Sequence, residues 1–108
     1  MMSMITRILS GNSQFTRPTL VGRGEVLQYE INETTPSFVS NVVVQWIIGG
    51  VDASQPVDRD TRWRTVKSMT VGSDGAAGVY DGGKAWYRIG IPSDGWTSGA
   101  AEVKLIAG

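Results

Sequence analysis

Two neighbouring carboxylates give the sequence its clearest candidate for metal or acid–base chemistry. The stretch "DRD" places Asp58 and Asp60 on one side of a local extended segment. Paired carboxylates can bind calcium or share a proton. The glycine, the further carboxylates and the closing glutamate of a calcium-binding loop are missing here. The sequence therefore favours a solvated loop, in which Asp58 and Asp60 pair with nearby arginines, over a metal site.

Hydroxyl side chains gather in "SDGWTSG", which places Ser93, Thr97 and Ser98 near Asp94. A serine nucleophile needs a positioned base to activate it. The chain contains no histidine and no cysteine, so its composition lacks the commonest base, the commonest metal ligand and any thiolate. We therefore expect no enzyme, with no catalytic residues, no metal ligands and no cofactor.

The aromatic residues present a choice between a ligand platform and a core. Tryptophan and tyrosine rings can stack on sugars or bases, and they also fill the interior of small β-proteins. Trp46 and Tyr87 lie in phase with valines and isoleucines, which predicts that they are core. Trp86 is out of phase and shares its face with Arg88, which predicts a cation–π contact or a subunit interface. Trp96 lies in a turn and is the aromatic that we most expect to contact another molecule.

The composition is that of one globular domain with no net charge. The chain has 108 residues, of which 41% are hydrophobic and 19% charged, with ten basic and ten acidic side chains. A formal charge of zero gives no long-range attraction to nucleic acid or to an anionic membrane, so we expect neither partner. It also gives little electrostatic protection against self-association, which favours a homo-oligomer.

Alternating apolar residues predict strands throughout, and no window of a dozen residues sustains helical spacing. We therefore predict an all-β fold, an antiparallel β-sandwich or barrel of six to eight strands in a single domain. The predicted core comprises Val44, Trp46, Tyr87, Ile89, Val103 and Leu105. The strand patterns are "GEVLQYEIN", "NVVVQWIIGG", "RWRTVKSMTV", "AWYRIGI" and "AAEVKLIA".

Three details of these strands lead to specific expectations. Both faces of Val42–Ile48 are largely apolar, which predicts a central strand covered on both sides or by a second subunit. Trp63 and Val66 fall on opposite faces of their strand, and a bulge near Thr65 would reconcile them. The segment "PSDGWTSG" (92–99) is typical of a hairpin link, and 49–62 is the longest irregular connection.

The N-terminal segment 1–14 is either an arm or the first strand, ahead of a sandwich domain at 15–108. An arm at Met1–Leu9 could add a strand to a neighbouring subunit. The candidate interface residues are Met4, Ile5, Ile8, Leu9, Trp86, Arg88 and Trp96.

A family resemblance rests on the segments "VVVQW", "TRWRTV", "GVYDGGKAWYRIGI" and "GWTSGAAEVKLI". Together they resemble the strand and turn pattern of small all-β accessory proteins in the virions of tailed bacteriophages. The segment "FTRPTLVGRGEVL" also looks like the opening of many phage structural proteins, with Val21 and Glu25 standing where that pattern has Tyr and Asp. The resemblance covers residues 15–107.

The resemblance implies a capsid decoration (cement) protein, which is made in the host cytoplasm and sits on the capsid surface of the virion. Such proteins are often homotrimers that clamp neighbouring copies of the major capsid protein. The alternative is a host-glycan-binding or adaptor module of a phage tail or fibre, recognising its ligand through Trp96, Tyr80 and the loops around them.

Overall fold

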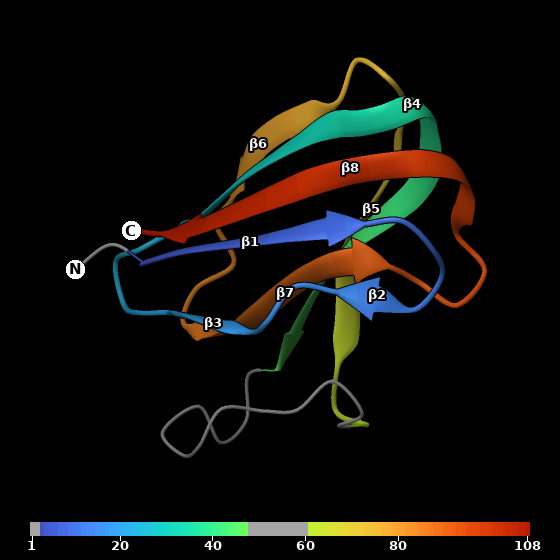
Figure 1. Cartoon of the computed structure of the whole chain (residues 1–108). Helices are drawn as coiled ribbons and strands as arrows, with labels where there is room; N and C mark the ends of the chain where they lie inside the picture. Colours follow the sequence, from blue (N-terminus) through green and yellow to red (C-terminus); the bar gives the residue numbers. More distant parts are fainter. Residues whose placement is uncertain (1–2, 48–60) are drawn as a thin grey trace.

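Eight β-strands make up the secondary structure of residues 3–47 and 61–108, the part of the chain that the computed structural model describes. No helix occurs within these residues. The strand pairs are antiparallel, and they form one nearly closed, barrel-like sheet (Figure 1). The predicted all-β, antiparallel, single-domain fold of six to eight strands is confirmed. The strands are Ser3–Leu9 (β1), Gln14–Phe15 (β2), Thr19–Val21 (β3), Leu27–Ile47 (β4), Arg64–Val71 (β5), Ala76–Tyr80 (β6), Ala85–Ile91 (β7) and Trp96–Ala107 (β8).

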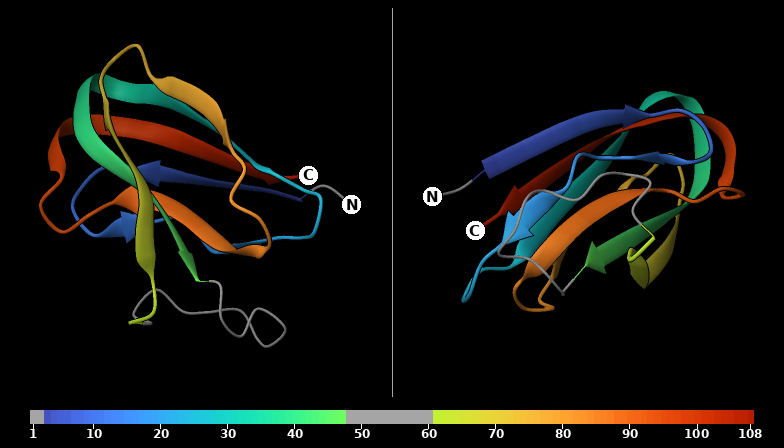
Figure 2. Two further views of the ribbon diagram at one scale, coloured as in Figure 1. Left: turned by 180° about the vertical axis from the view of Figure 1, so that it is seen from behind. Right: turned by 90° about the horizontal axis from the view of Figure 1, so that it is seen from below.

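Strand β4 organises the fold because its 21 residues belong to both halves of the sheet. Its first part, Leu27–Ile31, pairs with β6 on one side and with β8 on the other. Its last part, Ser40–Ile47, pairs with β5 and β7. The register against β8 shifts between Glu33 and Ser40, where β4 passes from one half to the other. One half-sheet is therefore β1–β8–β4–β6, and the other is β5–β4–β7 with β2 and β3 along β7 (Figures 1 and 2).

Two turns of similar sequence, "GSDG" (72–75) and "PSDG" (92–95), place the remaining strands around β4. In each turn the final glycine N–H donates to the carbonyl oxygen of the first residue, over 3.0 Å in Gly75–Gly72 and 3.3 Å in Gly95–Pro92. The first turn joins β5 to β6 on one side of β4, and the second joins β7 to β8 on the other. The predicted hairpin at 92–99 is wrong, because β4 lies between β7 and β8, and β8 already begins at Trp96.

The core lies between the two half-sheets and uses alternate residues of each strand. Of the six predicted core residues, five are fully buried: Val44, Tyr87, Ile89, Val103 and Leu105. The prediction for Trp46 is wrong, since this side chain is only half-buried against the core. Trp46 lies near the end of β4 and packs against Tyr80 of β6. Because β6 is an edge strand, the Trp46 ring is only partly covered by other side chains on that side. The remaining core is built mainly by Leu9, Val21, Leu27, Tyr29, Ile31, Phe38, Val42, Val71, Ala85, Ile91, Ala101 and Ala107.

The second apolar face of β4 is covered within the chain. Val43 and Ile47 are only 6% and 3% exposed. The alternative prediction, that a second subunit covers this face, is therefore not needed at these two positions. Ile48 lies outside the described residues. The predicted bulge near Thr65 is confirmed. Val44 pairs with Lys67 and Gln45 pairs with Thr65, which leaves Val66 as the extra residue of β5.

The N-terminal strand β1 belongs to the chain's own sheet. It pairs with β8 from Ser3 opposite Ala107 to Leu9 opposite Ala101. The start of β1 and the end of β8 lie at the same end of the sheet (Figure 1). Nearby, the backbones of Val26 and Gly108 exchange two hydrogen bonds of 3.0 and 3.1 Å.

Candidate interaction surface

The register of four strands assembles a row of three aliphatic side chains, with Gln28 between two of them, on the side of the β1–β8–β4–β6 half-sheet that faces away from the core; it is called the aliphatic row. Met4 lies opposite Ile106, Ile106 opposite Gln28, and Gln28 opposite Val79. Met4 is 63% exposed and Val79 58%, whereas Ile106 is half-buried. Because side chains alternate along a strand, the intervening residues face the core. This surface, here called the outer face, comprises Met4, Thr6, Ile8, Gln28, Glu30, Ala77, Val79, Glu102, Lys104 and Ile106.

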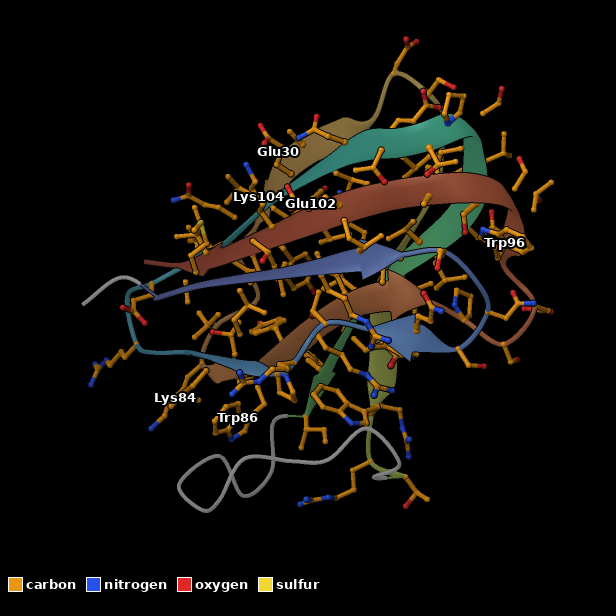
Figure 3. The ribbon with its side chains drawn as sticks, in the orientation of Figure 1. Glu30, Lys84, Trp86, Trp96, Glu102 and Lys104 are labelled. Carbon is orange, nitrogen blue, oxygen red and sulfur yellow. The ribbon has the colours of Figure 1, made fainter. Side chains whose placement is uncertain are left out.

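A charged group lies beside the aliphatic row. Lys104 Nζ is 4.0 Å from Glu30 Oε1 and 3.9 Å from Glu102 Oε1 (Figure 3). These three side chains are between 38% and 52% exposed. Exposed ion pairs stabilise a fold by only about 0–1 kcal/mol each. The group therefore matters mainly as a polar border with one surplus negative charge.

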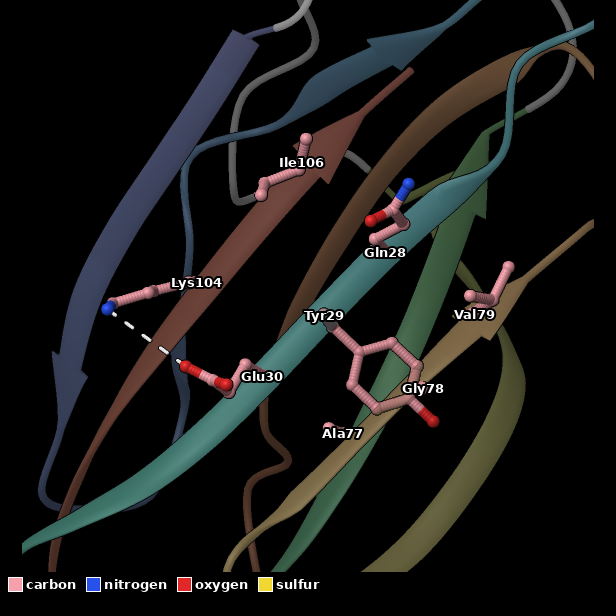
Figure 4. Close-up of a pocket in the computed structure, with 8 residues that line it drawn as sticks. All are labelled: Gln28, Tyr29, Glu30, Ala77, Gly78, Val79, Lys104 and Ile106. Atoms are coloured by element: carbon pink, nitrogen blue, oxygen red, sulfur yellow. Dashed lines mark ion pairs between the residues drawn. The ribbon is translucent and has the colours of Figure 1, made fainter.

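The outer face is hollowed over β6 and β4. A depression of about 450 Å³ is lined by residues of β4, β6 and β8, with Lys104 and Glu30 at one side (Figure 4). Ala77 and Gly78 contribute almost no side chain to it. A Cβ atom on Gly78 would lie 2.6 Å from the hydroxyl oxygen of Tyr29, so the Tyr29 ring fills the space beneath this strand.

Two of the four N-terminal candidates lie on the outer face, and two do not. Met4 and Ile8 are exposed, Ile8 by 47%. Ile5 points the other way and packs partly against the core. Leu9 is fully buried, so its prediction as an interface residue is wrong. The strand period of two places Ile5 and Leu9 on the core side whenever Met4 and Ile8 face outward.

Arg88 is only 6% exposed, so its prediction as an interface residue is also wrong. Its guanidinium carbon lies 3.8 Å from the ring centroid of Phe15 and 4.4 Å from that of Trp63. Its Nε donates a hydrogen bond of 2.9 Å to Gln45 Oε1. The predicted cation–π contact of this face exists, but Phe15 and Trp63 make it rather than Trp86.

The two candidate tryptophans lie away from the outer face (Figure 3). Trp86 is half-buried on β7 between Leu20 and Ile47, and its enclosed indole nitrogen has no hydrogen-bond partner in the described structure. Trp96 is half-buried against the core, and its indole N–H donates to the Gly99 carbonyl over 3.0 Å. The prediction that Trp96 lies in a turn is wrong, because β8 begins at this residue; its contact with another molecule stays a prediction.

Three of the other aromatic rings form an internal cluster. The ring centroids of Trp46, Tyr80 and Tyr87 are 5.8 to 6.4 Å apart. Burial, with the nearby Tyr80 and Asp81, raises the pKa of Tyr87 to about 12, and its hydroxyl donates to the Gly83 carbonyl over 2.9 Å. All nine aromatic residues lie in the described part of the chain, and each is buried or half-buried. None is presented as an exposed stacking platform.

The acidic and hydroxyl side chains that the sequence singled out lie in a turn, at the start of β8 or outside the described residues. No cluster of three or more acidic, histidine or cysteine residues that could hold a metal occurs in 3–47 and 61–108. Ser93 and Asp94 are exposed in the turn before β8, and Asp58 and Asp60 lie outside the described residues. Within the same described ranges, no helix is long and apolar enough to cross a membrane.

Sequence reasoning missed Val79 and Ile106 as surface residues. Ile106 falls on the polar phase of its strand, in the series Glu102, Lys104, Ile106, and an aliphatic residue at such a position was the available signal. Strand β6 reads "AAGVY" and has no polar phase, so its sequence offered no such signal for Val79. Comparisons of the chain with protein-family models, with curated proteins and with solved structures found no match.

Proposed function

We propose that the chain is a non-enzymatic accessory protein of a phage virion, which attaches to an assembled protein shell through its outer face. The observation that carries the proposal is the row of exposed Met4 and Val79 and half-buried Ile106, beside the charged group of Glu30, Lys104 and Glu102. An apolar centre with a polar border is the usual anatomy of a protein–protein interface.

The position of the row favours a flat partner surface over a small ligand. The row crosses all four strands of one half-sheet, from the edge strand β1 to the edge strand β6. The aromatic rings that would stack on sugars are buried or half-buried instead. Contact through aliphatic side chains on a rigid sheet requires no catalytic group, consistent with a sequence that has no histidine or cysteine.

The resemblance to phage accessory proteins supplies the identity of the shell. The proposed partner is the major capsid protein, and the proposed location is the capsid surface. Self-association, with a homotrimer as the form implied by the resemblance, belongs to the same proposal.

Co-sedimentation tests the proposal directly. Purified protein is mixed with assembled shells of the major capsid protein from its own source and, separately, with an array of free glycans. The expected result is saturable co-sedimentation with the shells and no glycan binding. Binding to a glycan without binding to shells would overturn the proposal in favour of a tail or fibre module.

A further inference from the structure

The second edge of β6 is a strand edge that the described part of the chain leaves unpaired. Ala76–Tyr80 pairs with Leu27–Ile31 of β4, and no other described strand pairs with β6. β5 lies on the same side of β4 but pairs further along, at Ser40–Trp46, and does not run beside β6. An unpaired edge presents backbone N–H and C=O groups that another strand can bind.

This edge also lacks the features by which proteins discourage strand addition. Charged side chains, bulges and prolines commonly protect edges. β5 has the exposed Arg64 and Lys67 and a bulge at Val66, and on β1 the Arg7 side chain donates to the Phe15 carbonyl oxygen of β2. β6 reads "AAGVY", with no charge, no proline and no bulge, and its Val79 is 58% exposed.

The sequence of β6 is complementary in size to itself. Its small residues, Ala76 and Ala77, lie at one end, and its large residues, Val79 and Tyr80, lie at the other. If two copies run antiparallel about a two-fold axis at Gly78, Val79 faces Ala77 of the second copy on the outer side. Tyr80 then faces Ala76 of the second copy on the core side. Each large side chain meets a small one, so no two large side chains collide across the pairing, and the facing pairs are close enough to interact.

Charge is compatible with the same arrangement. The nearest charged outer-face residue beside this edge, Glu30, lies on β4 opposite Ala77. Two copies of β6 would separate Glu30 from its counterpart by three strand spacings, about 14 Å in all. That exceeds the screening length of about 8 Å at physiological salt. The pairing therefore brings no like charges face to face on the outer side.

We propose that a second copy of this chain binds the β6 edge, antiparallel and centred on Gly78, to join two half-sheets into one. The contact uses a strand edge rather than the outer face, so it goes beyond the proposed shell contact and does not depend on it. Its short length, five residues a side, is small against the roughly 20–30 residues a side of a stable interface. The association is therefore weak and concentration-dependent in solution.

Cysteine pairing tests the register cleanly, because the chain has no cysteine of its own. Ala77→Cys carrying a tag and untagged Val79→Cys are mixed at high concentration and oxidised. The expected main product is the disulfide between position 77 of one copy and position 79 of the other, in clear excess over either homodimer. A matched mixture of Ser68→Cys and Thr70→Cys, at exposed positions of the edge strand β5, should show no such excess. Equal yields from both mixtures would overturn the proposal.

Charge variants give a second readout that does not rely on cross-linking. Ala77 and Val79 are both exposed, so the fold should tolerate a charged side chain at either position. Ala77→Lys with Val79→Lys opposes lysines across the two-fold axis, and should weaken association by about tenfold or more. Ala77→Lys with Val79→Glu places opposite charges face to face and should associate at least as well as the natural chain. Sedimentation across concentrations measures the association constants of the two variants and of the natural chain, whose mass is 11.6 kDa. Equal association of the two variants would contradict the two-fold pairing at β6, whatever further contacts the chain makes through other surfaces.

Discussion

Arg88 lies with its guanidinium carbon 3.8 Å from the centroid of the Phe15 ring, which ties the central strand β7 to β2. Trp63 covers the same guanidinium at 4.4 Å, and Gln45 accepts its Nε hydrogen. A planar guanidinium can stack and donate at the same time, whereas an ammonium cannot.

Arg88→Lys should therefore destabilise the fold although it keeps the charge. We expect a loss of about 1–3 kcal/mol, from the stacking and from the hydrogen bond left unmade at Gln45. Urea unfolding measures it. Arg23→Lys, at an exposed position, is the matched control and should change stability by less than about 0.5 kcal/mol. Equal effects of the two substitutions would show that the stacking contributes nothing.

Arg88 also shows where prediction from the sequence stops. The alternation of "AWYRIGI" places Arg88 opposite the main core face, which is correct. That face is nevertheless covered, because β2 and Trp63 come from distant parts of the chain. Burial of Arg88 by these residues depends on how distant segments pack in the folded chain, and the alternation within a single strand does not predict that packing. The same reason explains Trp96, which follows a turn-like sequence but begins the strand that pairs with β4.

The long strand β4 was predictable only in pieces. Its two apolar runs, around Tyr29 and around Val44, were each recognised as strands. The polar stretch between them, which includes Glu33, was assigned to no strand from the sequence, but it continues the pairing with β8 through shifts of register. The outer face depends on that pairing, so its aliphatic row could not be assembled from single-strand patterns alone.

Gly75 and Gly83 offer a matched test of backbone crowding, because both have positive φ, +75° and +87°. A Cβ at Gly75 would lie 2.3 Å from the Ile31 carbonyl oxygen, whereas nothing lies within 4 Å at Gly83. Both alanine substitutions should cost about 1 kcal/mol from the backbone conformation. Gly75→Ala should cost about 1–3 kcal/mol more from the collision. Similar urea midpoints for the two variants would contradict the close approach of this turn to β4.

The phenol of Tyr87 should titrate unusually late. Its pKa is raised from 10.0 to about 12, mainly because it is buried. A pKa raised by folding means that the associated stability is complete below pH 10 and is lost as the pH rises toward 12. Near-ultraviolet phenolate absorbance should show a titration step near pH 12, and Tyr87→Phe should remove this step. A titration of wild type and variant that differs only in total amplitude would refute the assignment.

The Glu33 carboxylate should make the fold sensitive to acid. A hydrogen bond from Ser73 and one from the backbone N–H of Phe38, at 2.8 Å, hold the pKa of Glu33 below its ordinary value of 4.5. A lowered pKa means that this stability is present above pH 4.5 and is lost as the pH falls below it. Glu33→Gln should therefore be less stable than wild type near neutral pH and should converge with it in acid. Asp94→Asn, in an exposed turn, is the control, and a gap for Glu33→Gln that stays constant with pH would refute the role of the carboxylate.

Shell binding by paired lysine variants tests the central claim, attachment through the outer face, most directly. Met4→Lys with Ile8→Lys places two charges on the outer face, and Ser68→Lys with Thr70→Lys places two on exposed positions of β5. Neither pair touches β6, so the result is independent of the proposed self-pairing. The affinity for assembled shells, measured by co-sedimentation, should fall about tenfold or more for the first variant, a loss of at least about 1.4 kcal/mol. The second variant should bind like the natural chain. If both variants bind equally well, or if the natural chain does not bind shells, the outer face is not the attachment surface.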